Sequence, residues 1–173
     1  MDDSETKKEE RPAVPPLQPL HVHRILAPTD LTELSTSALR YAIRLGLSLG
    51  AEVVALHIHE ILLDPPEGAM DLHMISKGEV DTWRHDVKRQ FDEYLERLTT
   101  IPDHVVGVLR FSQDPWKEIS TVAEEMSADL LVVSTHHHSV LEYLFQVSDA
   151  EKIVRHAPCP VLVIHQDTRS ALG

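Results

Sequence analysis

The sequence predicts a single α/β domain, built on a five-stranded, parallel, doubly wound sheet of the Rossmann-like type. Five short apolar segments of strand length alternate with segments whose apolar residues recur at helical spacing. Parallel neighbouring strands need a helical, right-handed crossover between them, so this alternation favours a parallel sheet. We expect the strand order 3-2-1-4-5. The length of 173 residues is enough for one such domain with a sizeable core and too short for two.

The first strand and helix follow directly after residue 23. Residues 24–28 (RILAP) have the apolar character and length of a short strand. Asp30, with Glu33 three residues later, predicts the N-cap of a helix, and Gly50 predicts its end because glycine tolerates the left-handed conformation of a C-cap. The apolar residues between these caps recur at helical spacing and predict a face packed against the sheet. That face comprises Leu34, Ala38, Tyr41, Ala42, Leu45 and Leu49.

The middle of the chain predicts a strand, a long helix and a third strand. Residues 52–60 (EVVALHIHE) are apolar enough to be buried on both faces of the sheet. A polar, proline-containing loop over residues 63–72 leads to a helix over residues 76–100, and residues 104–111 (HVVGVLRF) predict the next strand. The residues expected to face inward on this helix are Val80, Trp83, Val87, Phe91, Tyr94, Leu95 and Leu98.

The last third of the chain predicts two helices and two strands. Asp114 as an N-cap and Pro115 at the first helical position start the third helix. Residues 129–134 (DLLVVS) predict the fourth strand, residues 148–151 (SDAE) form a capping box for the last helix, and residues 159–165 (CPVLVIH) predict the fifth strand. The apolar stripe of the third helix is Ile119, Val122, Ala123 and Met126.

The terminal segments and the overall composition indicate how far the domain extends, where the protein is located and which partners are disfavoured. We expect a disordered or extended tail over residues 1–22, a domain over residues 23–167 and a C-terminal tail over residues 168–173, because the prolines of the first segment prevent a helix or a central strand. The net charge of −12 disfavours binding to nucleic acid or to an anionic membrane, and no apolar stretch approaches membrane-spanning length. The single cysteine, Cys159, fits a reducing compartment, so we expect a cytoplasmic protein.

The expected ligand crevice follows from the strand order. In open parallel sheets, ligands bind at the carboxyl ends of the strands where the winding direction reverses. For the order 3-2-1-4-5, this point lies between residues 27–30 (APTD) and residues 134–139 (STHHHS).

Three stretches, in chain order, resemble the universal stress protein family. Residues 24–58 (RILAPTDLTELSTSALRYAIRLGLSLGAEVVALHI) resemble its opening, in which the first strand ends in Pro-x-Asp ahead of an alanine-rich helix. Residues 114–139 (DPWKEISTVAEEMSADLLVVSTHHHS) are similar to its third helix and fourth strand, and residues 147–164 (VSDAEKIVRHAPCPVLVI) to its C-terminal signature. The resemblance implies a small α/β domain made in response to stress, usually a homodimer through its last strand.

The nucleotide-binding branch of that family uses Gly-x2-Gly-x9-Gly followed by Ser or Thr. Aligned on Ser148, the three glycines fall on Ser134, His137 and Val147, so the chain looks closer to the branch that lacks the motif. Glycines in a phosphate loop allow left-handed angles and close approach of backbone N–H groups to the anion, whereas a β-branched Val147 resists such angles. Asp149, in the first turn of the last helix, would take the place of an anion and repel a phosphate.

The resemblance also assigns residues at the nucleoside end of the crevice. Pro28 and Asp30 stand where nucleotide-binding members of the family contact the nucleoside, although ending a strand and capping a helix are sufficient roles for them. We expect no conventional ATP binding and no other cofactor; an ATP-binding switch with an atypical phosphate loop is the alternative. The expected remnant crevice comprises Pro28, Asp30, Ser134, Thr135, His137, Val147 and Ser148.

The twelve histidines include two His-x-His pairs near strand ends, His57/His59 and His136/His138. Alternate residues of a strand point to the same side, so each pair could chelate one ion. Histidine spacing without cysteines or fixed outer partners is a weak metal signal, so we predict no metal site. A His-rich, metal-dependent hydrolase is a second alternative.

The sequence predicts that the protein is not an enzyme. It lacks the Gly-x-Ser-x-Gly, Walker A and Rossmann glycine patterns that would mark a catalytic or phosphate-binding turn. We therefore expect a stress-response binding module. It should act as a homodimer through its last strand, whose apolar edge would otherwise be exposed, and through an unidentified protein partner.

Overall fold

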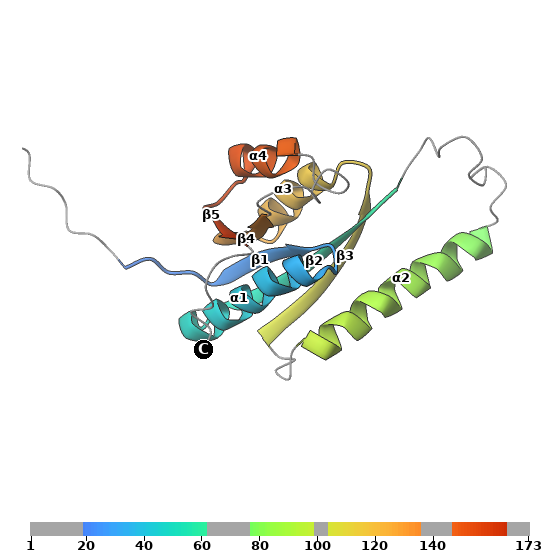
Figure 1. Ribbon diagram of the computed structural model, residues 1–173, viewed down its shortest axis with the longest axis horizontal. Coiled ribbons are helices and arrows are strands. Elements are labelled where there is room, and N and C mark those ends of the chain that lie inside the picture. Colours follow the sequence, from blue (N-terminus) through green and yellow to red (C-terminus); the bar gives the residue numbers. More distant parts are fainter. Residues whose placement is uncertain (1–18, 62–76, 99–103, 136–146, 166–173) are drawn as a thin grey trace, which may run out of the picture.

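Figure 1 shows the computed structural model, which describes residues 19–61, 77–98, 104–135 and 147–165. Within these ranges the chain forms five strands and four helices. They are β1 (Arg24–Thr29), α1 (Glu33–Leu49), β2 (Glu52–Glu60), α2 (Lys77–Leu98), β3 (Val105–Ser112), α3 (Pro115–Glu125), β4 (Leu130–Thr135), α4 (Val147–His156) and β5 (Val161–His165). The strands pair in the order β3-β2-β1-β4-β5, and every pairing is parallel. The predicted fold class and strand order are confirmed.

Helices cover both faces of the sheet. α1 and α2 pack against one face, which includes Ile25 and Val53, and α3 and α4 pack against the other, which includes Leu26 and Val54. All four side chains are buried, because the central strands have an apolar layer on each side. This explains why residues 52–60 form a nearly continuous apolar run instead of an alternating one.

The amino end of α1 differs from the prediction. Thr32, not Asp30, is the N-cap, since the Thr32 hydroxyl accepts the backbone N–H of Ser35. The Asp30 carboxylate instead accepts hydrogen bonds from the backbone N–H and the hydroxyl of Thr32, so it supports the residue that caps the helix. Gly50 ends α1 with φ of 68°, as predicted.

The buried face of α1 is rotated relative to the predicted stripe. Leu49, expected to face the sheet, is 48% exposed. A helical turn has 3.6 residues, so residues spaced four apart rotate progressively around the helix axis. By Leu49, the predicted apolar stripe that begins at Leu34 no longer faces the sheet. The buried apolar residues are Ala38, Leu39, Ala42, Ile43 and Gly46.

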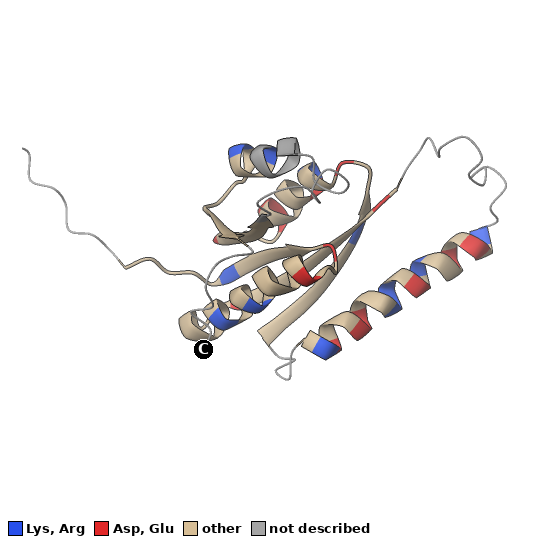
Figure 2. Cartoon of the chain, viewed as in Figure 1, with Lys and Arg blue, Asp and Glu red and all other residues tan. Residues whose placement is uncertain are grey.

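α2 begins and ends close to its predicted limits, but it packs less deeply. Val87 and Phe91 are its buried residues, while Trp83, expected to face inward, remains 39% exposed. The helix covers β3, which lies at an edge of the sheet and offers a narrow surface. Its outer side carries alternating charges, visible in Figure 2, and pairs them three or four residues apart. These exposed pairs are Lys88–Asp92, Arg89–Asp86 and Arg89–Glu93.

The two last helices start differently. α3 begins as predicted, with Asp114 at the N-cap position and Pro115 next, but the Asp114 carboxylate pairs with Lys117 at 2.7 Å and makes no capping hydrogen bond. α4 begins at Val147, whose backbone is already helical, so Ser148 lies inside the helix. The predicted N-cap at Ser148 is therefore wrong, and the side chains of this first turn lie outside the described part of the chain.

Polar groups close the amino edge of the sheet. The Asp129 carboxylate accepts the backbone N–H groups of His23 and Arg24 at 2.7 and 3.0 Å, and these hydrogen bonds lower the pKa of Asp129. Arg24 also pairs with Glu52 at 2.6 Å and donates to the carbonyl of Met126. The starts of β1, β2 and β4 are thus tied together.

The predicted domain limits remain predictions. Residues 1–18 and 166–173, which contain most of the two predicted tails, lie outside the described residues, as does the predicted loop over residues 63–72. Among the helices that the structure describes, none combines the length and the apolar character needed to cross a membrane.

Candidate functional site

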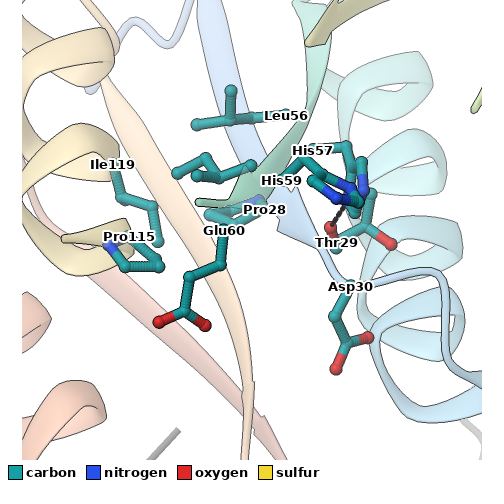
Figure 3. Close-up of a pocket in the computed structure, with 10 residues that line it drawn as sticks. Pro28, Thr29, Asp30, Leu56, His57, His59, Glu60, Pro115 and Ile119 are labelled. Carbon is teal, nitrogen blue, oxygen red and sulfur yellow. Dashed lines mark hydrogen bonds between the residues drawn. The ribbon is translucent and has the colours of Figure 1, made fainter. Parts of the chain in front are cut away.

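A pocket opens at the carboxyl ends of β1 and β2, beside the amino end of α3 (Figure 3). It has a volume of about 260 Å³ and mostly apolar walls. The carboxyl edge of a parallel sheet is where such folds bind ligands, so this pocket is the candidate site. Its lining residues are Pro28, Thr29, Asp30, Leu56, His57, Ile58, His59, Glu60, Pro115 and Ile119.

The loop after β1 carries Asp30 to the rim of the pocket. The Oδ1 atom of Asp30 accepts the backbone N–H of Thr32 at 3.0 Å and the Thr32 hydroxyl at 2.6 Å. Leu31, between them, has φ of 66°, in the left-handed region that costs a side-chain-bearing residue roughly 1–2 kcal/mol. Two contacts offset this strain: the Leu31 N–H donates to Thr29 Oγ1 at 3.1 Å, and the Leu31 side chain packs against the core.

His57 forms the wall of the pocket on β2. Its Nδ1 lies 2.9 Å from the carbonyl oxygen of Thr29, the residue with which it pairs in register (dashed line in Figure 3). Because a carbonyl oxygen only accepts, Nδ1 carries the proton and donates. The ring is buried and packs against Phe91, with 5.7 Å between ring centroids. His57 therefore locks the ends of β1 and β2 to each other.

His59 joins the pocket to α2 and β3. Its ring centroid lies 5.0 Å from that of Trp83 and 5.8 Å from that of Phe111. Burial and, to a smaller extent, the neighbouring His57 lower the pKa of His59. The neutral imidazole is therefore the favoured form at pH 7.

The two histidines of β2 lie on the same face of the strand, with 6.1 Å between their ring centroids, but they are engaged elsewhere. His57 Nδ1 is used by a carbonyl, and His59 packs against aromatic rings. Within the described ranges, His, Cys, Asp and Glu side chains form no group of three or more that could hold a metal ion. The second predicted pair, His136 and His138, lies outside these ranges.

The charged side chains at the pocket are acidic. Asp30, on the loop after β1, and Glu60, at the end of β2, extend away from the sheet at the open side of the pocket (Figure 3). None of the described residues that line it is a lysine or an arginine. Pro115 and Ile119 of α3 form the apolar wall on the other side. The pocket thus favours uncharged or cationic groups over phosphate.

Of the predicted site residues, the structure brings Pro28 and Asp30 together in the pocket. Ser134 lies in β4, opposite Ile164 of β5, and is not among the lining residues. The part of the predicted crevice that belongs to β1 is therefore the part that the pocket contains.

The other predicted site residues lie around the connection from β4 to α4. Thr135 is the last residue of β4, and Val147 and Ser148 begin α4; their side chains are not described. His137 lies outside the described residues altogether. Their role in a ligand site remains a prediction.

The pocket also contains residues that the sequence reasoning does not single out as site residues. Glu60 is the last residue of a predicted strand, and Pro115 begins the helix that follows the next predicted strand. The sequence therefore predicts that both lie at the carboxyl edge of the sheet, but not that they share a pocket. The packing of α3 over the end of β2 is a long-range contact, and no local pattern signals it. Among the described residues, this contact gives the pocket one wall from α3 beside the ends of β1 and β2.

Comparisons with known proteins agree on one family. Residues 21–165 match the model of the universal stress protein family. A universal stress protein of Methanocaldococcus jannaschii is 31% identical over 145 residues, which covers 82% of this chain and 81% of the relative.

Solved structures share the fold. A protein from the universal stress protein family of Burkholderia pseudomallei has a TM-score of 0.57 at 25% identity, covering 85% of this chain and 98% of that one. The universal stress protein from Archaeoglobus fulgidus in complex with dAMP has a TM-score of 0.51 at 16% identity, covering 84% of this chain and 99% of that one. With the family model and the relative, these findings show that the chain belongs to the universal stress protein family.

Proposed function

We propose that the chain is a non-catalytic regulatory module of the stress response, without conventional ATP binding. In this proposal it acts in the cytoplasm as a homodimer and through a protein partner. Membership of the universal stress protein family supports the stress-response role. The acidic rim of the pocket, formed by Asp30 and Glu60, is the observation that carries the proposal about ATP.

The sequence between β4 and α4 supports the same conclusion. Residues 136–146 (HHHSVLEYLFQ) contain no glycine, lysine or arginine, and they include an acid, Glu142. A triphosphate needs backbone N–H groups that can approach it closely, or cations, to balance its charge. Neither this segment nor the described lining of the pocket supplies a permanent cation.

Calorimetric titration with ATP and Mg²⁺ tests the proposal, with adenosine as a ligand that lacks phosphate. We expect no measurable binding of ATP to the wild-type protein and a gain in ATP affinity in Glu60→Gln, because this change removes a repulsive charge. Glu96→Gln, on the exposed side of α2, changes the net charge equally and should leave ATP binding unaltered. Micromolar or tighter binding of ATP to the wild type would contradict the proposal.

A nucleotide-regulated switch is the second candidate. Its support is the solved Archaeoglobus fulgidus relative, which is in complex with dAMP, together with Pro28 and Asp30 in the pocket. The same titration separates the two candidates, since a switch requires tight binding of an adenine nucleotide.

The proposed dimer uses β5. This strand lies at an edge of the sheet, and the apolar side chains from Val161 to Ile164 are only half-buried in the single chain. A partner strand would hydrogen-bond to the outer edge of β5 and cover these side chains. Analytical ultracentrifugation should therefore find a dimer at micromolar concentration, and a monomer there would contradict the proposed assembly.

The proposed absence of catalysis is tested separately. A steady-state assay with ATP and phosphoesters should show no turnover above that of the Ser148→Ala variant. Turnover that the variant loses would establish an enzyme and overturn this part of the proposal.

A further inference from the structure

Three buried hydroxyl groups at the end of β1 and the start of α1 form a network that reaches Tyr94 of α2. Thr29, Ser35 and Thr36 are 5%, 4% and 7% exposed, respectively. The Tyr94 hydroxyl oxygen lies 3.1 Å from Thr29 Oγ1 and 2.9 Å from Thr36 Oγ1, and Thr29 Oγ1 lies 3.0 Å from Ser35 Oγ. Buried hydroxyls need partners, and here the partner comes from a helix 65 residues further along the chain than Thr29.

The carbonyl oxygen of Thr32 determines part of the donor pattern in this network. Thr36 Oγ1 lies 2.6 Å from the carbonyl oxygen of Thr32, which only accepts, so Thr36 gives its proton to that carbonyl. Tyr94 must then donate its own proton to Thr36, and its oxygen also lies within hydrogen-bonding distance of Thr29 Oγ1. Thr29 Oγ1 lies between the hydroxyl oxygens of Tyr94 and Ser35, and it accepts the N–H of Leu31 whichever of the two receives its own proton.

α2 contacts the pocket lining at three places, one of which is the packing of Phe91 against His57. Tyr94 meets Thr29 at the end of β1, and Trp83 meets His59 near the end of β2. The buried residues of α2, Val87 and Phe91, lie between these two contacts along the helix. The seating of this helix is therefore tied to the geometry of the pocket.

We propose that Tyr94 is a positioning residue for the pocket. Its hydroxyl oxygen, 3.1 Å from Thr29 Oγ1, helps to hold in place the atom that accepts the Leu31 N–H and keeps Leu31 in its left-handed conformation. That conformation presents Asp30 at the rim of the pocket, so Tyr94 acts on the rim without touching the ligand. The assignment rests on the proposed function in one respect, namely that this pocket is the ligand site.

Amide hydrogen exchange measured by NMR on the ligand-free protein tests the assignment. In Tyr94→Phe, we expect the Leu31 amide to exchange roughly threefold to tenfold faster, the effect of one lost hydrogen bond of typical strength. The amide of Val132, in the buried strand β4, serves as the reference and should change less. The ¹³C shift of the Asp30 carboxyl group should move as well.

Tyr41→Phe is the matched control. Tyr41 is a half-buried tyrosine of α1 whose hydroxyl makes no hydrogen bond within the described residues, so its loss should leave Leu31 and the Asp30 carboxyl shift unchanged. The assignment is overturned if Leu31 in Tyr94→Phe exchanges at the wild-type rate. It is also overturned if Leu31 and Val132 accelerate equally, which would indicate a general loss of stability.

This experiment needs neither a ligand nor a dimer. Its result is therefore independent of the calorimetric and ultracentrifugation tests of the proposed function. Failure of either proposal can be recognised without the other.

Discussion

Replacing Gly46 by alanine tests how closely α1 packs on β2. Gly46 lies on the buried face of α1, and a Cβ added there would be 2.5 Å from Cγ2 of Val53 and 3.0 Å from the carbonyl oxygen of Ala51. Neither atom can withdraw easily, because Val53 is buried in the core and Ala51 belongs to the tight connection in which its N–H donates to the Gly46 carbonyl. The substitution therefore forces two rigid elements apart.

Two opposing terms set the magnitude of this effect. Alanine in place of glycine stabilises an unobstructed helix interior by about 1 kcal/mol. Overpacking of a rigid core costs about 1–3 kcal/mol, and a contact below 3 Å against a buried side chain belongs to the upper part of that range. The expected net effect of Gly46→Ala is a loss of about 1–2 kcal/mol in the free energy of unfolding.

Urea unfolding and thermal melting followed by circular dichroism measure the change. Gly78→Ala is the matched control, because no atom of the described residues outside the backbone of its own helix lies within 4 Å of a Cβ added at Gly78, in the first turn of α2. It should stabilise the protein by up to about 1 kcal/mol. In a domain of this size, the expected Tm of Gly46→Ala is roughly 2–8 °C below the wild type. A stabilised Gly46→Ala, or equal shifts in both variants, would refute the close packing of α1 on β2.

Three further measurements follow from the structure. Leu31→Gly should be more stable to urea than Leu31→Ala by about 1 kcal/mol, since glycine tolerates the positive φ of residue 31. A Leu31→Ala variant more stable than Leu31→Gly would contradict the backbone strain at this position. Burial and the neighbouring His57 lower the pKa of His59 in the folded state, so between that lowered pKa and about 6.5 the unfolded chain binds more protons than the folded one and stability falls as the pH is lowered. Urea midpoints across this pH window should therefore vary less in His59→Leu than in the wild type. An unchanged pH dependence of the midpoint would argue against this role of His59. Burial, with a smaller contribution from Asp129, raises the pKa of the Cys159 thiol, so iodoacetamide at pH 8 should alkylate the native protein more slowly than the urea-unfolded chain, and equal rates would count against it.

The parts of the fold that depend on local pattern could be predicted from sequence. Residues 52–60 form β2 with the predicted limits, because a run of apolar residues between polar ends identifies a strand covered on both faces. Gly50 ends α1 as predicted, since few other residues accept its φ of 68° at low cost. The alternation of strands and helices then determines a parallel sheet, because a parallel pair requires a crossover helix.

Other features depend on which hydrogen-bond partner a residue finds in three dimensions. The sequence predicted Asp30 as the N-cap of α1, whereas in the structure Thr32 accepts the Ser35 N–H and Asp30 supports Thr32. The stripe predicted for α1 includes Leu49, which the drift of a helix turns toward solvent. Local spacing therefore locates a helix more reliably than it locates its ends or its buried face.

The sequence by itself determined the family, the sheet and one side of the candidate site, through Pro28 and Asp30. The tertiary structure alone decided that α3 packs over the end of β2 and places Glu60 at the same pocket, and that Tyr94 of α2 meets Thr29 of β1. The physical reason is the range of the interactions. Hydrophobic periodicity and capping act over a few residues, whereas the pocket is made by side chains from separate elements that come together only when the core packs.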